Sequence, residues 1–426
     1  MPNSYVSSFA PTRWIRAVLK SLGPGIITGA ADDDPSGIAT YSVAGAQLGS
    51  KLLWTALLTW PLMAAVQMMC ARIGKVTGQG LAGNFKKRFP RWLLLVFVFA
   101  LLAANTINIG ADLAGMADAA AMLSGVNSHW FVVAFALLIS WATVRLEYKR
   151  IADVLKWLVL VLFAYPITAF VVGADWGQVL RDTLVPSMPQ SRSEWATLVA
   201  ILGTTISPYL FFWQTSEEVE EEKSAGQSSL AQRRGATREE LELRNIDVGV
   251  GAFFSNMVMF FIILTTAITL NRHGITNIET SRQAAEALRP FAGKFATTLF
   301  TLGIVGVGFL AIPTLAGSAA YAFAETLGWR QGLNKKLRQA RWFYALILAS
   351  TGVGVGLDFI GVNPVRALYW TAVINGLLAP FLLIAILIVA ADSRLMQGQP
   401  SSRLGWIVVA VTTIAMFAAG VAMFVV

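Results

Sequence analysis

Hydrophobic residues of this 426-residue chain gather in long runs, which short polar or charged segments separate. A run of about 20 residues, folded as a helix, crosses a hydrocarbon core of about 30 Å. The runs predict about eleven such spans, near 23–49, 52–74, 92–122, 130–147, 152–174, 195–215, 247–271, 295–325, 342–361, 364–391 and 405–426. The pattern therefore predicts an all-α integral membrane protein with no soluble domain of ordinary size.

Composition agrees with a bilayer environment and argues against several kinds of site. The chain is 56% hydrophobic and 13% charged, and its mean hydropathy is +0.61. The single cysteine, Cys70, lies in an apolar run, which excludes a disulfide framework and predicts a small core residue. The two histidines, His129 and His273, lie beside expected helix ends, so a histidine-rich metal enzyme is not expected. We predict no enzymatic activity and no cofactor, because the sequence shows no nucleophile paired with a base, phosphate-binding loop or metal-ligand cluster.

The net charge of +9 is distributed unevenly between alternate loops. If the N-terminus is cytoplasmic, most basic residues fall in inward loops: Arg13, Arg16, Lys20, Lys75, Lys86, Lys87, Arg88, Arg91, Lys149, Arg150, Arg233, Arg234, Arg238, Lys335, Lys336, Arg338, Arg341, Arg394 and Arg403. The positive-inside rule then predicts a cytoplasmic N-terminus and an outside Val426 in an inner or plasma membrane. Anionic headgroups account for the charge without a nucleic-acid partner. We also expect a monomer, and no removable signal peptide in the 1–22 tail.

The most polar part of the chain is 216–246, which contains an acidic cluster and then a basic group around Arg233. The acidic residues are Glu217, Glu218, Glu220, Glu221 and Glu222. We interpret this segment as a cytoplasmic loop with a short helix. An alternative is a vestibule that attracts cations.

Three acidic residues interrupt the first apolar span. Asp32, Asp33 and Asp34 precede Pro35, Ser36 and Gly37, and apolar residues lie on both sides. Each carboxylate at a helix centre costs about 2.5–3.5 kcal/mol, so a functional role is expected. Pro35 removes a helix hydrogen bond and predicts an unwound stretch with free carbonyls, for which a cation is the natural ligand. If the triplet lay outside the bilayer, it would only cap a helix.

The sixth span has a matching interruption at Ser207 and Pro208, one turn after Thr204. A proline kink satisfied by neighbouring hydroxyls is the alternative interpretation. Interrupted helices at corresponding positions of two halves indicate an inverted repeat with a central transport site. The predicted division is a 1–22 tail, repeats at 23–174 and 175–391, and a last loop and helix at 392–426.

The motifs around these breaks resemble the natural resistance-associated macrophage protein (NRAMP) family of divalent metal transporters. The resemblance rests on Gly23-Pro24-Gly25, Asp34-Pro35, Ala39-Thr40, Ala44-Gly45-Ala46-Gln47, Ala71-Arg72-Ile73-Gly74, Val76-Thr77-Gly78 and Gly203 through Pro208. It implies eleven helices in a LeuT-like 5+5 inverted repeat plus one, with helices 1 and 6 broken. It also implies alternating access and a metal held by Asp, Asn, a carbonyl and a Met sulfur.

The chain departs from the family pattern at the metal site. Where the family has an Asn in the first helix, this chain has Gly37. Where the family has Met-Pro-His in the sixth helix, this chain has Ser207-Pro208-Tyr209, and Thr204 stands where the family usually has Ala. The remaining donors are oxygens, which favour Mg²⁺ or Mn²⁺ over softer metals. We expect a roomier site for a partly hydrated ion, as in the NRAMP-related magnesium transporters. The predicted metal site comprises Asp34, Gly37, Thr204 and Ser207, with Asp33 and Asp32 holding outer waters.

Proton coupling is predicted to be weak or absent, because family acids and the histidine are replaced. Tyr41, Tyr209 and Gly115 stand at these positions, while Asp112 remains as a relay or as the partner of a basic side chain. Three other functions stay open: a conventional proton-coupled Mn²⁺/Fe²⁺ importer, an organic-solute transporter on the same fold, and a non-transporting membrane sensor.

Overall fold

The computed structural model describes residues 32–146 and 160–426, which form helices joined by turns and short loops. The α-helices are α3 (Pro35–Leu48), α4 (Leu53–Thr77), α5 (Leu81–Arg88), α6 (Arg91–Ser124), α7 (Ser128–Arg145), α9 (Ala164–Val172), α10 (Trp176–Leu184), α11 (Arg192–Thr205), α12 (Pro208–Ser224), α13 (Arg238–Thr269), α14 (Ser281–Glu286), α15 (Arg289–Ala292), α16 (Ala296–Leu327), α17 (Arg341–Asp358), α18 (Pro364–Ala391) and α19 (Arg403–Val425). Short 3₁₀ helices are η1 (Gly49–Leu52), η2 (Leu160–Phe163), η3 (Asn271–His273) and η4 (Gly293–Phe295).

The described helices account for the spans that the hydrophobic runs predict. Eight stretches are long and apolar enough to cross a membrane, and the first of them, Pro35–Thr77, contains both α3 and α4. Of the two remaining predicted spans, 152–174 contains α9, which is part of the shorter apolar helix Leu160–Val172, and 342–361 contains α17. Parts of the predicted spans 23–49 and 152–174, with the whole 1–22 tail, lie outside the described residues.

The predicted loop at 216–246 is wrong in extent. Helix α12 continues to Ser224 and α13 already begins at Arg238, so the connection covers only 225–237. Glu218 and Glu222 of α12 are not solvated as expected, because they are buried against basic partners on α4 and α13, whereas Glu221 is exposed. Short helices α5, α10, α14 and α15 also occupy segments that the hydrophobic pattern left as loops.

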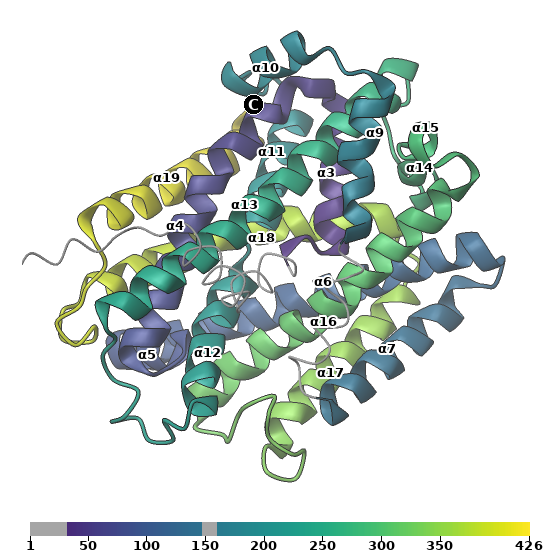
Figure 1. Ribbon diagram of the computed structural model, residues 1–426. Helices are drawn as coiled ribbons and strands as arrows, with labels where there is room; N and C mark the ends of the chain where they lie inside the picture. The colour runs from purple at the N-terminus through teal and green to yellow at the C-terminus, as the bar shows by residue number, and fades with distance from the viewer. Residues whose placement is uncertain (1–31, 147–159) are drawn as a thin grey trace, which may run out of the picture.

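Helix α3 lies inside the bundle, where it contacts α11, α13 and α18 (Figure 1). Its residues from Pro35 to Ser42 are all buried. Helix α11 crosses α18 at Gly203 and Gly376, where a Cβ on Gly203 would come within 2.2 Å of the Gly376 nitrogen. Cys70 is fully buried in α4, as predicted for a core residue.

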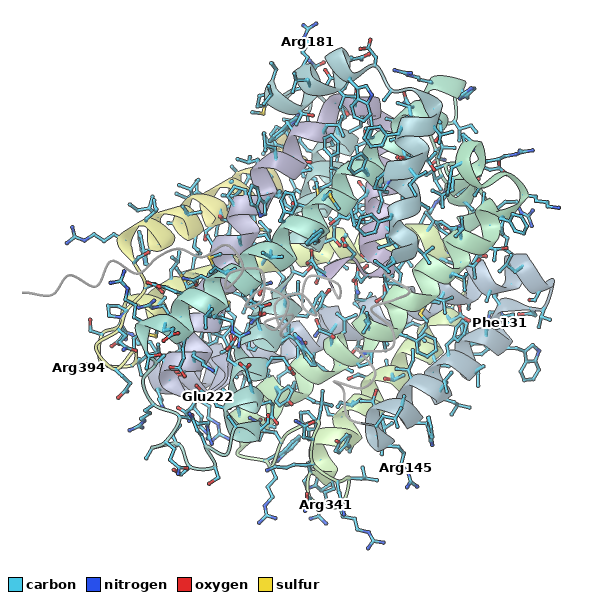
Figure 2. All side chains as sticks on the ribbon, in the orientation of Figure 1. Phe131, Arg145, Arg181, Glu222, Arg341 and Arg394 are labelled. Carbon is cyan, nitrogen blue, oxygen red and sulfur yellow. The ribbon has the colours of Figure 1, made fainter. Side chains whose placement is uncertain are left out.

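Labelled arginine side chains lie at both ends of the bundle (Figure 2). Arg145, Arg341 and Arg394 lie towards one end, and Arg181 lies at the opposite end (Figure 2). The C-terminus lies at the same end of the bundle as α10, the helix that carries Arg181 (Figure 1). The C-terminus is therefore at the end away from the Arg341 and Arg394 loops.

Candidate functional site

The two helix breaks have the same local construction. Pro35 and Pro208 each occupy the first turn of a helix, where a proline costs no hydrogen bond. The preceding residues, Asp34 and Ser207, have extended backbones with ψ of 170° and 133°. Proline disfavours the helical conformation of the residue before it, so each Xaa-Pro pair starts a new helix direction inside the bundle.

Asp34 caps the N-terminus of α3 and is 2% exposed. Its Oδ1 accepts a hydrogen bond from the Gly37 N–H at 2.6 Å, and its Oδ2 accepts one from the Asn108 amide at 3.0 Å. A carboxylate at this place is stabilised by the free N–H groups of the first turn. The protein therefore holds the Asp34 carboxylate in a fixed orientation next to the break.

Gly37 and Thr204 face each other across the two breaks. A Cβ on Gly37 would lie 3.2 Å from Thr204 Oγ1 and 3.4 Å from Asp34 Oδ1. The Thr204 hydroxyl is buried and lies close to the Asp34 carboxylate. The predicted grouping of Asp34, Gly37 and Thr204 is thus present, but Thr204 occupies part of the space that glycine leaves.

The Ser207 hydroxyl hydrogen-bonds to the backbone of the residues just before it. Its Oγ donates towards the carbonyls of Gly203 at 2.8 Å and Thr204 at 2.7 Å, both of which lie in the last turn of α11. This satisfies backbone groups that the Pro208 break leaves without a helical partner. In this conformation Ser207 acts as a cap, and the prediction that it is a metal ligand remains untested.

Asp32 and Asp33 face the adjacent helix α13 through one shared residue. Ser255 Oγ lies 2.6 Å from Asp32 Oδ2 and 3.2 Å from Asp33 Oδ1. A hydroxyl has one proton, so it donates to only one of these carboxylates at a time. Both carboxylates are buried, which leaves negative charge beside Asp34 that a cation or protons must balance.

Asn108 joins the site to Asp112, and the sequence analysis missed it. Its Nδ2 lies 3.0 Å from Asp34 Oδ2 and 3.2 Å from Asp112 Oδ2, so one amide group contacts both carboxylates. The two α6 residues are one turn apart and share a helix face. The i,i+4 pair of polar residues in an apolar helix was the available signal. No ion pair among the described residues includes Asp112, so the alternative of a basic partner has no support in that part of the chain.

The remaining predicted residues line the same part of the bundle. Tyr41 is fully buried and its hydroxyl lies 3.1 Å from Thr205 Oγ1, which links α3 to the end of α11. Tyr209 is 1% exposed and follows Pro208 directly. Ser36 donates to the Leu368 carbonyl at 3.0 Å and thereby fixes α3 to α18.

The two histidines have structural partners away from this group. His129 Nδ1 lies 2.5 Å from Asp358 Oδ2 and its ring stacks on Phe359, while His273 Nδ1 lies 2.8 Å from the Thr269 carbonyl oxygen. The described residues contain no group of three His, Cys, Asp or Glu side chains arranged to hold a metal. The groups beside Asp34 are therefore carboxylates, a hydroxyl and an amide, which offer oxygen donors.

Comparison with known proteins gives a consistent picture. Residues 25–426 match the family described as natural resistance-associated macrophage protein-like. A relative named "Divalent metal cation transporter MntH" from Caldanaerobacter subterraneus subsp. tengcongensis is 26% identical over 400 residues, which cover 90% of this chain and 87% of the relative. A protein of the same name from Yersinia enterocolitica is 28% identical over 329 residues, covering 74% of this chain and 76% of the relative.

Solved structures agree on the fold. The Eremococcus coleocola manganese transporter has a TM-score of 0.74 at 17% identity, covering 99% of this chain and 89% of that structure. Mhp1, a nucleobase-cation-symport-1 family transporter, has a TM-score of 0.59 at 14% identity, covering 95% of this chain and 90% of that structure. These likenesses establish the LeuT-like arrangement of a 5+5 repeat with one additional helix. The chain belongs to the natural resistance-associated macrophage protein-like family.

Proposed function

We propose that this protein transports divalent metal cations across a membrane by alternating access, with Asp34 as the central ligand. The observation that carries the proposal is a buried carboxylate that lies between two helix breaks and has no ion-pair partner among the described residues. An unpaired charge in such a place is costly, and a cationic cargo removes the cost when it binds. The relatives named as divalent metal cation transporters support the same cargo class.

We favour Mg²⁺ or Mn²⁺ over softer metals. The Asp34 carboxylate, the Thr204 hydroxyl and the Gly37 carbonyl are oxygen donors, with Asp33 and Ser207 as further candidates. Hard cations prefer such donors, whereas thioether and thiolate ligands select softer metals. We expect an octahedral ion bound by these groups to keep some of its water, because Mg²⁺ in particular gives up water reluctantly.

Weak or absent proton coupling is part of the proposal, and one feature of the site favours the alternative of a proton-coupled importer. Asp112 is buried without a basic partner in the described chain and is connected to Asp34 through Asn108. Such a carboxylate can carry a proton when the cation leaves. Uptake of Mn²⁺ into liposomes loaded with a pH-sensitive dye distinguishes the two, because only coupled transport acidifies the lumen in proportion to the metal.

The proposed orientation places the Arg341 and Arg394 loops in the cytoplasm of a plasma membrane and the C-terminus outside. The position of Arg145, Arg341 and Arg394 at the end opposite Arg181 supports it (Figure 2). We further propose that the protein acts as a monomer, because each chain contains a complete set of helix breaks around one site.

Calorimetric titration of the purified protein with Mn²⁺, Mg²⁺, Ca²⁺ and Cd²⁺ tests the proposal, with Asp34→Ala as the site variant. Asp118→Asn is the matched control, since Asp118 is an acidic residue of α6 that accepts from the Ser281 N–H at 3.3 Å, outside the site. We expect binding of Mg²⁺ and Mn²⁺ to be lost in Asp34→Ala and kept in Asp118→Asn. Tight Cd²⁺ binding without an effect of Mg²⁺ would contradict the hard-ion preference, and unchanged binding in Asp34→Ala would contradict the site itself.

A further inference from the structure

The amide of Asn108 has a bonding pattern that packing alone does not explain. Asn108 is fully buried on α6, and both hydrogens of its amino group have acceptors, Asp34 Oδ2 at 3.0 Å and Asp112 Oδ2 at 3.2 Å. The donor capacity of the side chain is therefore used in full. Two carboxylates on different helices are held together by one neutral group.

The acceptor side of the same amide is unused. Asn108 Oδ1 is buried and accepts no hydrogen bond from any residue in 32–146 or 160–426, and the same holds for Asp112 Oδ1. Buried amide and carboxylate oxygens normally find a donor. Thr204 Oγ1, on the facing break, is a third buried oxygen and lies close to the Asp34 carboxylate. Two buried oxygens of α6 without a donor in the described chain thus occur near Asp34, the carboxylate that lies at the helix breaks.

Charge at this place points to the kind of group that completes it. Asp34 and Asp112 approach the same amide, and the described ion pairs include neither of them. A proton donor would satisfy one oxygen, whereas a divalent cation would satisfy several oxygens and balance both carboxylates. The amide oxygen is a donor type that Mg²⁺, Ca²⁺ and Mn²⁺ accept.

We infer that Asn108 is a ligand-providing residue of the cation site, so that Asp34, Asn108 and Asp112 together form a subsite for the divalent cargo. This deepens the proposed function and rests on it. In the structure the Asn108 amino group faces both carboxylates, so binding of the cation requires the amide to turn about its terminal torsion. The Oδ1 of Asn108 then supplies from α6 the neutral amide oxygen that position 37 of α3 lacks. The subsite then draws its oxygens from α3 and α6, and Thr204 adds a hydroxyl from α11.

The test measures Kd for Mn²⁺ and Mg²⁺ by calorimetry on the full-length protein, with Asn108→Ala and Asn108→Asp. Loss of a metal ligand or its supporting shell typically weakens binding by about 10–100-fold, so Asn108→Ala should raise Kd by about tenfold or more. Asn108→Asp keeps oxygen atoms at the site but, when ionised, removes the N–H donors. A ligand role predicts that its Kd equals or falls below that of the unaltered protein.

Asn105→Ala is the matched control. Asn105 has the same side chain on the same helix and is 1% exposed, but its amide donates to the Leu315 carbonyl at 2.8 Å and Ser318 Oγ at 2.9 Å on α16. Its substitution should lower the melting temperature and leave Kd within about twofold, as expected of a packing contact. The melting temperature without metal separates loss of folding from loss of binding in every variant.

Each result decides the inference. An unchanged Kd in Asn108→Ala overturns it, and so does an equal loss in Asn108→Ala and Asn108→Asp, since that would show a role only in positioning the carboxylates. If Asn108→Ala does not fold, retained binding in Asn108→Asp supports the inference and lost binding overturns it. If Asp34→Ala abolishes binding while Asn108→Ala does not, the proposed function stands and only the role of Asn108 fails.

Discussion

Gly37 and Thr204 share one space in the interior, because the Thr204 hydroxyl lies next to the place that a side chain at position 37 would occupy. Thr204 Oγ1 lies 3.2 Å from the point where a Cβ on Gly37 would stand. That distance is tighter than ordinary van der Waals contact, so neither side chain can grow independently of the other. Glycine at position 37 therefore also fits the threonine at position 204, which leaves little room for a larger side chain.

Gly37→Asn should destabilise the protein by about 1–3 kcal/mol, the usual cost of overpacking a filled interior. The double variant Gly37→Asn with Thr204→Ala should recover most of this loss, because the hydroxyl that the new side chain meets is gone. Thermal unfolding of the two single variants and the double variant measures the coupling. Residues in direct contact couple by about 0.5–3 kcal/mol, so additive effects would show that the two positions do not share space.

The sequence predicts part of this site and not the rest, for a physical reason. Asp34 and Pro35 are evident because a charged residue and a helix breaker within an apolar span are costly wherever they pack. Asn108 is different, since a single amide in an apolar helix is equally consistent with an ordinary contact between helices. Only the packing of α6 against α3 shows that its amide contacts two carboxylates.

Helix α12 shows how charge can mislead at the scale of an element. Its acidic residues are typical of a solvated loop, yet α12 packs along α4 and α16 and buries Glu218 completely. Arg244 of α13 compensates for this with Nε 2.8 Å from Glu218 Oε1 and Nη1 2.8 Å from Asp247 Oδ2, and it also pairs with Glu221. Sequence alone cannot show this pairing, because Arg244 is 26 residues away from Glu218.

Arg244→Met should cost about 3–5 kcal/mol, because it leaves buried carboxylates without their counter-charge. Arg238→Met is the control on the same helix, where the side chain is 92% exposed and pairs only with Glu242 across one turn. An exposed pair of this kind contributes less than about 1 kcal/mol. Denaturant or thermal unfolding compares the two, and equal losses would show that the α12–α13 network is not buried.

The crossing of α11 and α18 depends on glycine. A Cβ on Gly203 would lie 2.1 Å from the Ala372 carbonyl oxygen, and one on Gly376 would lie 2.4 Å from the Val199 carbonyl oxygen. These contacts are with backbone, which cannot turn aside as a side chain can. The position of Thr204, the next residue along α11, therefore depends on this close approach.

Gly203→Ala should separate α11 from α18, lower the melting temperature and reduce metal uptake severalfold. Gly352→Ala in α17 is the matched control, since a Cβ there meets no atom within 4 Å. The control should be neutral or stabilising by up to about 1 kcal/mol, because alanine favours a helix more than glycine does. Uptake into proteoliposomes and thermal unfolding measure both effects. Unchanged uptake and an unchanged melting temperature in Gly203→Ala would show that α11 and α18 are farther apart at the crossing than these distances indicate.

At the scale of the whole molecule, hydrophobic length predicts the fold well. Backbone groups in a lipid core must form hydrogen bonds within their own segment. Long apolar runs therefore form helices, however those helices pack against each other. The bounds are less predictable, because α5, α10, α14 and α15 are too short and polar to stand out from loops. The orientation depends on a charge difference and not on packing, and so needs a direct test.

Cysteine labelling provides that test. Cys70 is the single native cysteine and is fully buried, so a thiol reagent should label the unaltered protein weakly. Arg394→Cys and Arg181→Cys place thiols at opposite ends of the bundle (Figure 2). With a membrane-impermeant maleimide on intact cells, we expect Arg181→Cys to react and Arg394→Cys to react only after the membrane is opened. The reverse labelling pattern would show the opposite membrane orientation, with the Arg341 and Arg394 loops extracellular, which contradicts the positive-inside rule.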